Sequence, residues 1–388
     1  MEDQKKKKEE SLENNRGARK LNNGDVKNTE KKKDVYPVDV SQLFHDTVNK
    51  RGSDLHLSAG NPPLIRVDGD LVKLEYPVLK PWHISDMVKG IVKEEEWEKL
   101  KEDWELDFSI AKEGLARFRV NVMYQRGSLA AVFRTVPFGI PDIKSLGLPE
   151  TIYDLCEVNR GLVLVTGPTG SGKSTTLAAM IDYINNHRPV SIVTIEDPIE
   201  FLHKNKESSV KQREVGSDTR SFANALRRVL RHDPDIILIG EMRDLESISI
   251  ALTAAETGHL VLSTLHTQTA QQTVSRIVDV FQDHQRQQVR QQLSNTLRAV
   301  VAQQLLPKKG DDGRAVAVEI MRDSNAVSNL IREGKEHQLY STIQTSEQVG
   351  MQTLDRSLIN LYQKGVISEN TALKYCVSKE ELERYLNK

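Results

Sequence analysis

The feature that most constrains this chain is the segment Gly167–Ser174, which reads Gly-Pro-Thr-Gly-Ser-Gly-Lys-Ser. It fits the pattern of a phosphate-binding loop, in which a glycine and four further residues precede glycine, lysine, and serine or threonine. The apolar run Gly161–Thr166 before it predicts a buried strand, and Lys173–Asn186 after it predicts a helix. Such a loop turns backbone amides toward phosphate oxygens, and the helix N-terminus adds its dipole. The sequence therefore predicts a nucleotide-binding α/β fold.

The residues of this loop have separate roles in the prediction. Lys173 is expected to reach the β and γ phosphates, and the Ser174 hydroxyl is expected to bind magnesium. The residues expected to hold ATP are Gly167, Pro168, Thr169, Gly170, Ser171, Gly172, Lys173, Ser174 and Thr175. ATP and Mg²⁺ are therefore the expected substrate and metal. The alternative is an ordinary glycine-rich turn.

Strand and helix patterns alternate along the middle of the chain. Short, β-branched apolar runs between helical patterns are typical of a parallel sheet that is covered on both faces. We expect further strands at 191–195, 235–239 and 259–264, and helices at 219–231 and 245–256. Beyond them the pattern predicts a polar amphipathic helix over Gln285–Leu306, a strand over Val316–Met321, and two or three helices to the end.

Two of these strands end in carboxylates that could act on a bound nucleotide. Glu241 follows the strand at 235–239, and we expect it to orient and polarise the attacking water. Glu196 and Asp197 precede Pro198, which ends another strand, and they suit magnesium and its bound waters. Carboxyl ends of parallel strands meet at one edge of a sheet, where nucleotide sites lie. A helix cap or a solvated loop is the alternative for each carboxylate.

The histidines and cysteines do not predict a separate metal site. His259 and His266 lie seven residues apart along an extended strand, so they point to opposite faces and cannot share one ion. By spacing alone, a structural hydrogen-bonding role is favoured for each histidine, and a site role is the alternative. Cys156 and Cys376 cannot form a disulfide framework or a four-cysteine zinc site.

The first 34 residues hold 11 Lys and Arg and 8 Asp and Glu, and no aromatic residue. A segment this polar buries too little apolar surface to offset its ordering entropy, so we expect a disordered, solvated tail. The alternative is weak contact with anionic lipid through Lys5–Lys8 and Lys31–Lys33. Residues 35–137 predict a compact α+β domain, and the prolines and glycines of 138–149 predict a linker.

Composition excludes several classes of protein. The chain has 54 Lys and Arg against 55 Asp and Glu, so it lacks the overall positive charge that holds nucleic acid through its phosphates. No nucleic acid partner is expected. No apolar stretch approaches the ~18 residues that span a bilayer, and the N-terminus lacks the apolar core of a signal peptide. These observations favour a soluble protein of a reducing compartment.

Four segments together resemble the secretion ATPase superfamily. GPTGSGKST looks like its P-loop, TIEDPIEF its aspartate box, the strand ending in GEMRD its acidic strand, and TGHLVLSTLHT its histidine box. Within that superfamily the chain is similar to the retraction branch of the type IV pilus ATPases, from about Asp39 to Gly365. The stretches that carry this similarity are 51–69, 160–185, 233–259 and GMQTLD at 350–355.

The resemblance implies an α/β fold, with an N-terminal PAS-like α+β domain, a RecA-like P-loop NTPase core and a C-terminal helical region. The expected divisions are the tail at 1–34, the PAS-like domain at 35–137, the linker at 138–149, the core at 150–310 and the helical region at 311–388. It implies a cytoplasmic homohexamer that hydrolyses ATP to power pilus retraction and twitching motility. The implied partner is an inner-membrane pilus platform protein, which the hexamer would meet at the cytoplasmic face without being an integral membrane protein.

The resemblance also implies roles for individual side chains. Glu241 becomes the catalytic glutamate, Glu196 an acid that positions magnesium or water, and His266 a residue of the site. The first domain of the family supplies arginines to the phosphates, and Arg119 and Arg134 are the best candidates here. A guanidinium brought in by domain closure would stabilise the charge that develops on the transferred phosphoryl group.

The sequence departs from the retraction branch at one motif, which usually reads AIRNLIRE. Ser328 stands where that motif carries an arginine. The rival within the superfamily is a pilus-assembly or type II secretion ATPase, which usually adds a four-cysteine zinc site, whereas this chain has two cysteines. A nucleic-acid translocase is a further alternative, because Arg227, Arg228 and Arg231 form a basic helix end. A non-hydrolysing regulator is the last, and the intact phosphate loop and Glu241 speak against it.

Overall fold

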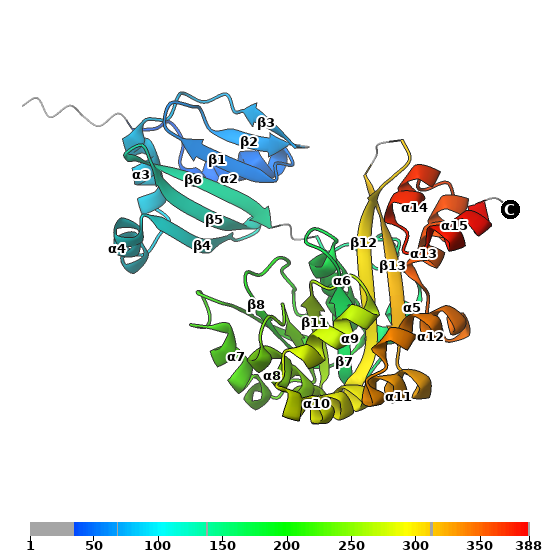
Figure 1. Cartoon of the computed structure of the whole chain (residues 1–388). Helices are drawn as coiled ribbons and strands as arrows, with labels where there is room; N and C mark the ends of the chain where they lie inside the picture. Colours follow the sequence, from blue (N-terminus) through cyan, green and yellow to red (C-terminus); the bar gives the residue numbers. More distant parts are fainter. Residues whose placement is uncertain (1–34, 68, 137–138, 311–312, 387–388) are drawn as a thin grey trace, which may run out of the picture. The chain divides into compact units, whose positions relative to one another are not determined.

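The computed structural model describes residues 35–386, except 68, 137–138 and 311–312. The predicted tail at 1–34 therefore lies outside the described residues. The described residues from Val38 onward form one compact unit, and every element named below belongs to it. This unit contains two β-sheets, each with helices packed against it (Figure 1).

The first sheet has six antiparallel strands in the order β3-β2-β1-β6-β5-β4. Its elements are α2 (Val40–Asn49), β1 (Asp54–Ser58), β2 (Leu64–Val67), β3 (Asp70–Lys73), α3 (Pro81–Lys89), α4 (Glu94–Asp103), β4 (Glu105–Lys112), β5 (Ala116–Gln125) and β6 (Ser128–Val136). The predicted α+β character of this part of the chain is confirmed. The sequence patterns predicted neither β3, whose four residues are all exposed, nor β4.

One face of this sheet is closed by α2. The helix begins where the Asp39 carboxylate accepts a hydrogen bond from the Gln42 amide, which caps its N-terminus. Its apolar residues share one side, and Phe44 stacks on Phe118 of β5 with ring centroids 4.1 Å apart. Phe44 also meets Phe133 of β6 edge to face at 5.1 Å. These three rings form the centre of the small core.

The second sheet has seven strands in the order β13-β12-β7-β11-β10-β8-β9. The strands from β12 to β9 are parallel, and β13 pairs with β12 antiparallel. The elements around it are α5 (Thr151–Cys156), β7 (Gly161–Thr166), α6 (Lys173–His187), β8 (Ser191–Glu196), β9 (Ser209–Glu214), α7 (Phe222–Val229), β10 (Ile236–Ile239), α8 (Leu245–Glu256), β11 (Leu260–Leu265), α9 (Ala270–Asp279), α10 (Asp283–Thr296), β12 (Leu297–Pro307) and β13 (Arg314–Arg322).

Both faces of this sheet are buried, which explains its continuous apolar strands. Leu162 and Leu164 of β7 face one core cluster together with residues of α7, α8 and α9. Val163 and Val165 face the opposite cluster together with residues of α5 and α6. Successive side chains of a strand alternate between faces, so each strand contributes to both layers. The predicted parallel sheet covered on both faces is confirmed.

The predicted helix over Gln285–Leu306 is wrong in its second half. Helix α10 ends at Thr296, and Leu297–Pro307 is the strand β12. This strand pairs with β7 on one side and β13 on the other, and most of its side chains are buried. Pairing on both edges outweighs the helical propensity of a segment that contains no glycine break. The predicted strand over Val316–Met321 is confirmed as part of β13.

The rest of the described chain is helical. It contains α11 (Asn325–Glu333), α12 (Leu339–Thr345), α13 (Leu354–Gln363), α14 (Glu369–Tyr375) and α15 (Lys379–Leu386). The last three pack against one end of the long hairpin formed by β12 and β13, where Leu306, Ala317 and Leu358 share a core cluster (Figure 1). The segment predicted as a linker joins the two sheets in the sequence. Its residues Ile143 and Leu148 are buried in the core cluster that also contains residues of α5 and α6.

None of the described helices is long and apolar enough to cross a membrane.

Candidate nucleotide-binding site

The loop between β7 and α6 has the backbone geometry that its glycines predict. Gly172 caps the N-terminus of α6 with φ of 88°, in the left-handed region that favours glycine. Gly167 has φ of 140°, and a Cβ at this position would lie 2.3 Å from the carbonyl oxygen of Gln303 on β12. The loop therefore lies directly against β12, and a side chain at Gly167 would force it away.

Lys173 begins α6 and turns its ammonium back into the loop. Its Nζ donates to the carbonyl oxygens of Gly167 at 2.9 Å and Pro168 at 3.0 Å. Burial lowers the pKa of Lys173 from its ordinary value, and the nearby carboxylates of Glu241 and Glu200 oppose that shift. Neutral loop carbonyls do not balance the charge of this ammonium, so it can donate to a negatively charged phosphate oxygen.

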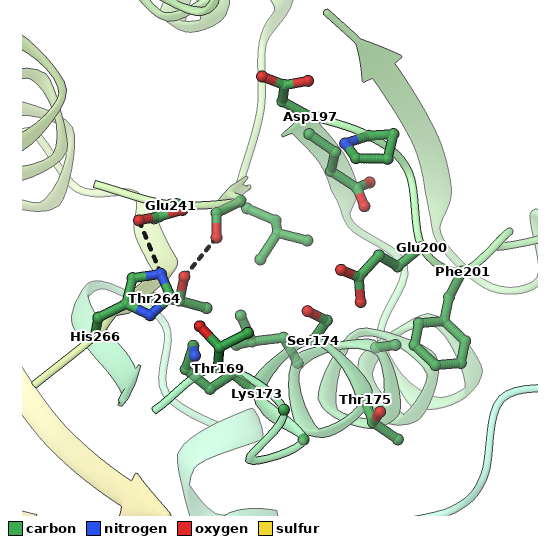
Figure 2. Close-up of a pocket in the computed structure, with 18 of the residues that line it drawn as sticks. Thr169, Lys173, Ser174, Thr175, Asp197, Glu200, Phe201, Glu241, Thr264 and His266 are labelled. Atoms are coloured by element: carbon green, nitrogen blue, oxygen red, sulfur yellow. Dashed lines mark hydrogen bonds and ion pairs between the residues drawn. The ribbon is translucent and has the colours of Figure 1, made fainter. Parts of the chain in front are cut away.

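A pocket of about 890 Å³ opens in front of this loop. Strand ends, the loop and the start of α6 contribute to its wall, as Figure 2 shows for ten labelled residues. The predicted site residues that line it are Thr169, Gly170, Gly172, Lys173, Ser174, Thr175, Glu196, Asp197, Glu241, His266 and Arg119. The predicted residues Gly167, Pro168 and Ser171 lie in the loop behind this wall, where Ser171 is buried.

Glu241 lies just beyond the end of β10, on the pocket wall. Its Oε2 accepts a hydrogen bond from Arg243 Nε at 2.8 Å, and its Oε1 lies 3.1 Å from His266 Nε2 (Figure 2). The side chain retains 23% of its exposure, so water can reach it. A carboxylate held by two neighbours at the edge of a phosphate pocket is suited to orienting a water molecule. The geometry thus brings Glu241 and His266 into contact on the pocket wall.

Glu196 lies deeper in the pocket wall, at the end of β8. Its Oε1 accepts hydrogen bonds from Thr194 Oγ1 at 2.6 Å and from Gln212 Nε2 at 3.0 Å. Burial raises the pKa of Glu196, although these two hydrogen bonds act in the opposite direction. Its position is therefore set by the protein, as a residue that positions a metal-bound water requires.

The carboxylates of Asp197 and Glu200 point in different directions, as Figure 2 shows. The Asp197 carboxylate points away from Ser174, whereas the Glu200 carboxylate points toward it. Glu200 ends the cluster Glu-Asp-Pro-Ile-Glu and is not among the residues predicted for the site. Glu200 also acts electrostatically on Lys173.

The donor set suits a magnesium ion that is held partly by nucleotide. Among the described residues, no group of three or more His, Cys, Asp or Glu is placed to hold a metal alone. Mg²⁺ usually combines one or two carboxylates with phosphate oxygens and waters, rather than an all-protein cage. The Ser174 hydroxyl, with Glu200 facing it, fits that requirement.

The two predicted arginines differ in their surroundings. Arg119 of β5 lines the pocket. Arg134 of β6 is not among the lining residues, and its Nε donates to Asp54 Oδ1 of β1 at 2.9 Å. The strand register places Arg134 beside both Arg119 and Asp54 on one face of the six-stranded sheet. The structure therefore brings Arg119, and not Arg134, to the pocket wall.

Arg117 makes a further contact near the pocket. Its Nη2 lies 3.0 Å from Glu214 Oε2 of β9, and Ser109 Oγ donates to Glu214 Oε1 at 2.5 Å. Burial alone would raise the pKa of Glu214, but hydrogen bonds from Ser109, the Ile199 amide and Arg117 outweigh it, so the pKa lies below its usual range. Glu214 is therefore held as a carboxylate.

The family model described as type II/IV secretion system protein matches residues 29–374. The chain belongs to this family. It is 51% identical over 335 residues to the type IV pilus retractation ATPase PilT of Pseudomonas aeruginosa, which covers 86% of this chain and 97% of that protein. It is 48% identical over 320 residues to a twitching motility protein of Neisseria gonorrhoeae, covering 82% and 86%.

A solved structure gives the same result for the fold. The crystal structure of the pilus retraction motor PilT with bound ADP superposes with a TM-score of 0.84 at 48% identity, covering 89% of this chain and 99% of that one. The predicted fold class, with its N-terminal α+β domain, P-loop core and C-terminal helices, is confirmed. So is the resemblance to the retraction branch.

Proposed function

We propose that this chain is an ATPase whose hydrolysis of ATP powers the retraction of a type IV pilus. The observation that carries the proposal is that Lys173 and Glu241 line the same pocket. The Lys173 ammonium is suited to binding phosphate, and the Glu241 carboxylate is suited to orienting a water molecule. Relatives named for pilus retraction and twitching motility, at 51% and 48% identity, supply the biological context. The structure with ADP supports a nucleotide as the ligand.

Each predicted residue has a role in this reaction. The loop from Gly167 to Thr175 binds the phosphates through its amides and through Lys173. Mg²⁺, when bound beside Ser174, would neutralise charge on the β and γ phosphate oxygens. Glu200 faces this position, and Glu196 and Asp197 would act on the ion only through water. Glu241 orients the attacking water, and His266 holds Glu241 in position. Arg119 stabilises the negative charge that develops on the γ-phosphoryl group. Arg134, which is paired with Arg119 in the strand register, adds positive charge from the neighbouring strand.

The active form that we propose is a homohexamer at the cytoplasmic face of the inner membrane. Its partner would be a pilus platform protein, and it would remain peripheral to the membrane. The domain divisions that we propose are those of the sequence analysis, with the PAS-like domain at 35–137 and the core beginning at residue 150.

The test of this function is deletion of the gene followed by counts of surface pili and assays of twitching. A retraction motor predicts cells with excess pili that no longer twitch, because assembly continues while removal stops. Cells without pili would instead identify an assembly ATPase of the same superfamily. Complementation with Lys173→Ala, which removes the phosphate-binding cation, should fail to restore twitching.

A further inference from the structure

Gln303 lies beneath the phosphate loop, in the middle of β12. The residue is only 3% exposed, and its neighbour Ala302 pairs with Thr166, the last residue of β7 before the loop. A buried carboxamide has two donors and an acceptor to satisfy, so its partners show what it holds in place.

Both ends of the Gln303 carboxamide contact the loop or the helix that follows it. Its Nε2 donates to the carbonyl oxygen of Ser171 at 2.6 Å. Its Oε1 accepts from the hydroxyl of Thr176, in the first turn of α6, at 2.9 Å. A carbonyl oxygen can only accept, so the amide nitrogen must face Ser171, and the assignment of oxygen and nitrogen is fixed by chemistry.

Two glycines of the loop also lie against Gln303. A Cβ at Gly167 would lie 2.3 Å from its backbone oxygen, and a Cβ at Gly172 would lie 3.1 Å from its Nε2. The loop therefore contacts this residue at its beginning, at Ser171 and at its end. Gln303 thus contacts the beginning of the loop through its backbone oxygen and the end of the loop through its side chain.

The hydrogen bond to Ser171 fixes the plane of one peptide group. The peptide bond between Ser171 and Gly172 is planar, and in the trans form its C=O and N–H point in opposite directions. Because the Ser171 carbonyl points at Gln303, the Gly172 N–H points away from β12. Gly172 is one of the residues that line the pocket. The same contact that holds the carbonyl therefore presents an amide donor on the pocket side.

We propose that Gln303 is a positioning residue for the phosphate loop: it holds the Ser171–Gly172 peptide so that the Gly172 amide is presented to the nucleotide phosphates. Thr176 assists by fixing the orientation of the carboxamide. This role rests on the proposed function, in which the loop binds the phosphates of ATP. Gln303 does not touch the substrate itself, and it acts only through the backbone of the loop.

The test uses Gln303→Met, which keeps the length and volume of the side chain but removes both hydrogen bonds. An amide donor binds phosphate equally before and during the reaction, so its loss changes KM and leaves kcat almost unchanged. We expect the KM for ATP and the Kd for ADP of the full-length protein to rise about five- to tenfold, the effect of losing one hydrogen bond. A loss of folded protein alone would lower the apparent kcat and leave KM unchanged.

The matched control is Gln304→Met, at the adjacent position of β12, whose side chain points to the other face of the sheet. It should leave KM and Kd at the values of the unaltered protein. Lys173→Ala separates the two proposals: if it still binds ADP as well as the unaltered protein does, the phosphate site itself is assigned wrongly. If Lys173→Ala loses ADP while Gln303→Met keeps the original KM and Kd, only the positioning role is overturned.

Thr176→Val provides a second test that does not depend on Gln303→Met folding. It keeps the branched shape of the side chain and removes the hydroxyl that orients the carboxamide. We expect a KM for ATP raised about two- to fivefold, smaller than for Gln303→Met because the bond to Ser171 can still form. An unchanged KM in this variant, when Gln303→Met does not fold, would overturn the proposal.

Discussion

The carboxylate of Glu241 is the residue on which turnover should depend most directly. It lies at the end of β10 with one oxygen toward Arg243 and the other toward His266, and water can reach it. Glu241→Gln keeps the shape of the side chain and removes its ability to accept a proton or polarise water. We expect kcat to fall by a factor of about 10² to 10⁴, with the Kd for ATP changed by less than about threefold. A time course of phosphate release measures kcat, and equilibrium binding measures the Kd for ATP.

The control for that prediction is Glu246→Gln, on the exposed side of α8, where Glu246 pairs with Arg227. A surface pair of this kind contributes little to stability and has no place in the reaction. Turnover in this control should match the unaltered protein. Turnover in Glu241→Gln close to that of the control would mean that another group activates the water.

The two arginines provide a comparison at the same scale. Arg119 lines the pocket, whereas Arg134 is paired with Asp54 and has a side chain that is 69% exposed. We expect Arg119→Ala to lower kcat about 10²-fold or more, because an arginine that meets the transferred phosphoryl group stabilises its developing charge. Arg134→Ala should lower it far less. Steady-state kinetics measure kcat for both variants. An equal fall in kcat would show that both guanidinium groups reach the phosphates.

The positions of the pocket residues along the chain are easier to predict from the sequence than the directions in which their side chains point. Lys173 follows from the loop motif. Glu241 follows from its place two residues after β10, because the carboxyl ends of parallel strands meet at one edge of the sheet. Glu200 and Asp197 come from one short segment, and only the path of the chain after Pro198 decides which carboxylate faces Ser174. The ion pair that holds Arg134 depends on strand pairing across 80 residues, which no local pattern contains.

At the scale of elements, β12 is the part that local sequence could not predict. Its residues continue the polar helix α10 without a glycine or proline between them, so helical propensity favoured one long helix. What makes it a strand is the pair of neighbours β7 and β13, on either side. Four of the parallel strands, β7, β8, β10 and β11, were predictable because each is short, apolar and buried on both faces. The edge strand β9 was not predicted, because its residues are mostly polar and only partly buried.

The neighbouring strand β13 carries a buried carboxylate whose charge should depend on pH. Glu319 is 2% exposed, and its Oε1 accepts from the Ala270 amide at the start of α9. Burial raises the pKa of Glu319 to about 7, with the Ala270 hydrogen bond acting against that rise and Asp355 adding to it. The folded protein therefore holds a proton that the unfolded chain releases at lower pH.

The sign of the resulting pH dependence follows from that difference. Between the unfolded pKa and the folded pKa of about 7 the native state binds more protons, so Glu319 makes stability fall as pH rises through this window. The glutamine of Glu319→Gln cannot ionise, so the stability of this variant does not fall with rising pH through that group. We expect its free energy of unfolding, relative to the unaltered protein, to rise from pH 5 to pH 8 by an amount on the order of 2–3 kcal/mol. Urea unfolding across that range measures it.

The control is Glu102→Gln, at an exposed position of α4. Its difference from the unaltered protein should stay constant over the same pH range. A Glu319→Gln difference that is equally flat would show that Glu319 ionises in the folded protein with an ordinary pKa.

At the scale of the whole molecule, the pocket is connected to the six-stranded sheet as well as to the seven-stranded one. Arg119 lines the pocket from β5, and Arg117 of the same strand contacts Glu214 of β9. A nucleotide that binds differently before and after hydrolysis would change the interactions of both arginines. That is the physical basis on which ATP hydrolysis could bias one arrangement of the chain over another.

If six copies form a ring, this coupling should extend from one subunit to the next. The test mixes unaltered subunits with Glu241→Gln subunits, which we expect to bind ATP and not to turn it over. When subunits act in a coupled order, one inactive member delays its neighbours, so ATPase activity should fall faster than in proportion to the fraction of Glu241→Gln subunits. Mixing with Glu246→Gln subunits should leave activity unchanged. A strictly proportional fall would mean that each subunit hydrolyses ATP independently, so that force on the pilus could not arise from ordered firing around the ring.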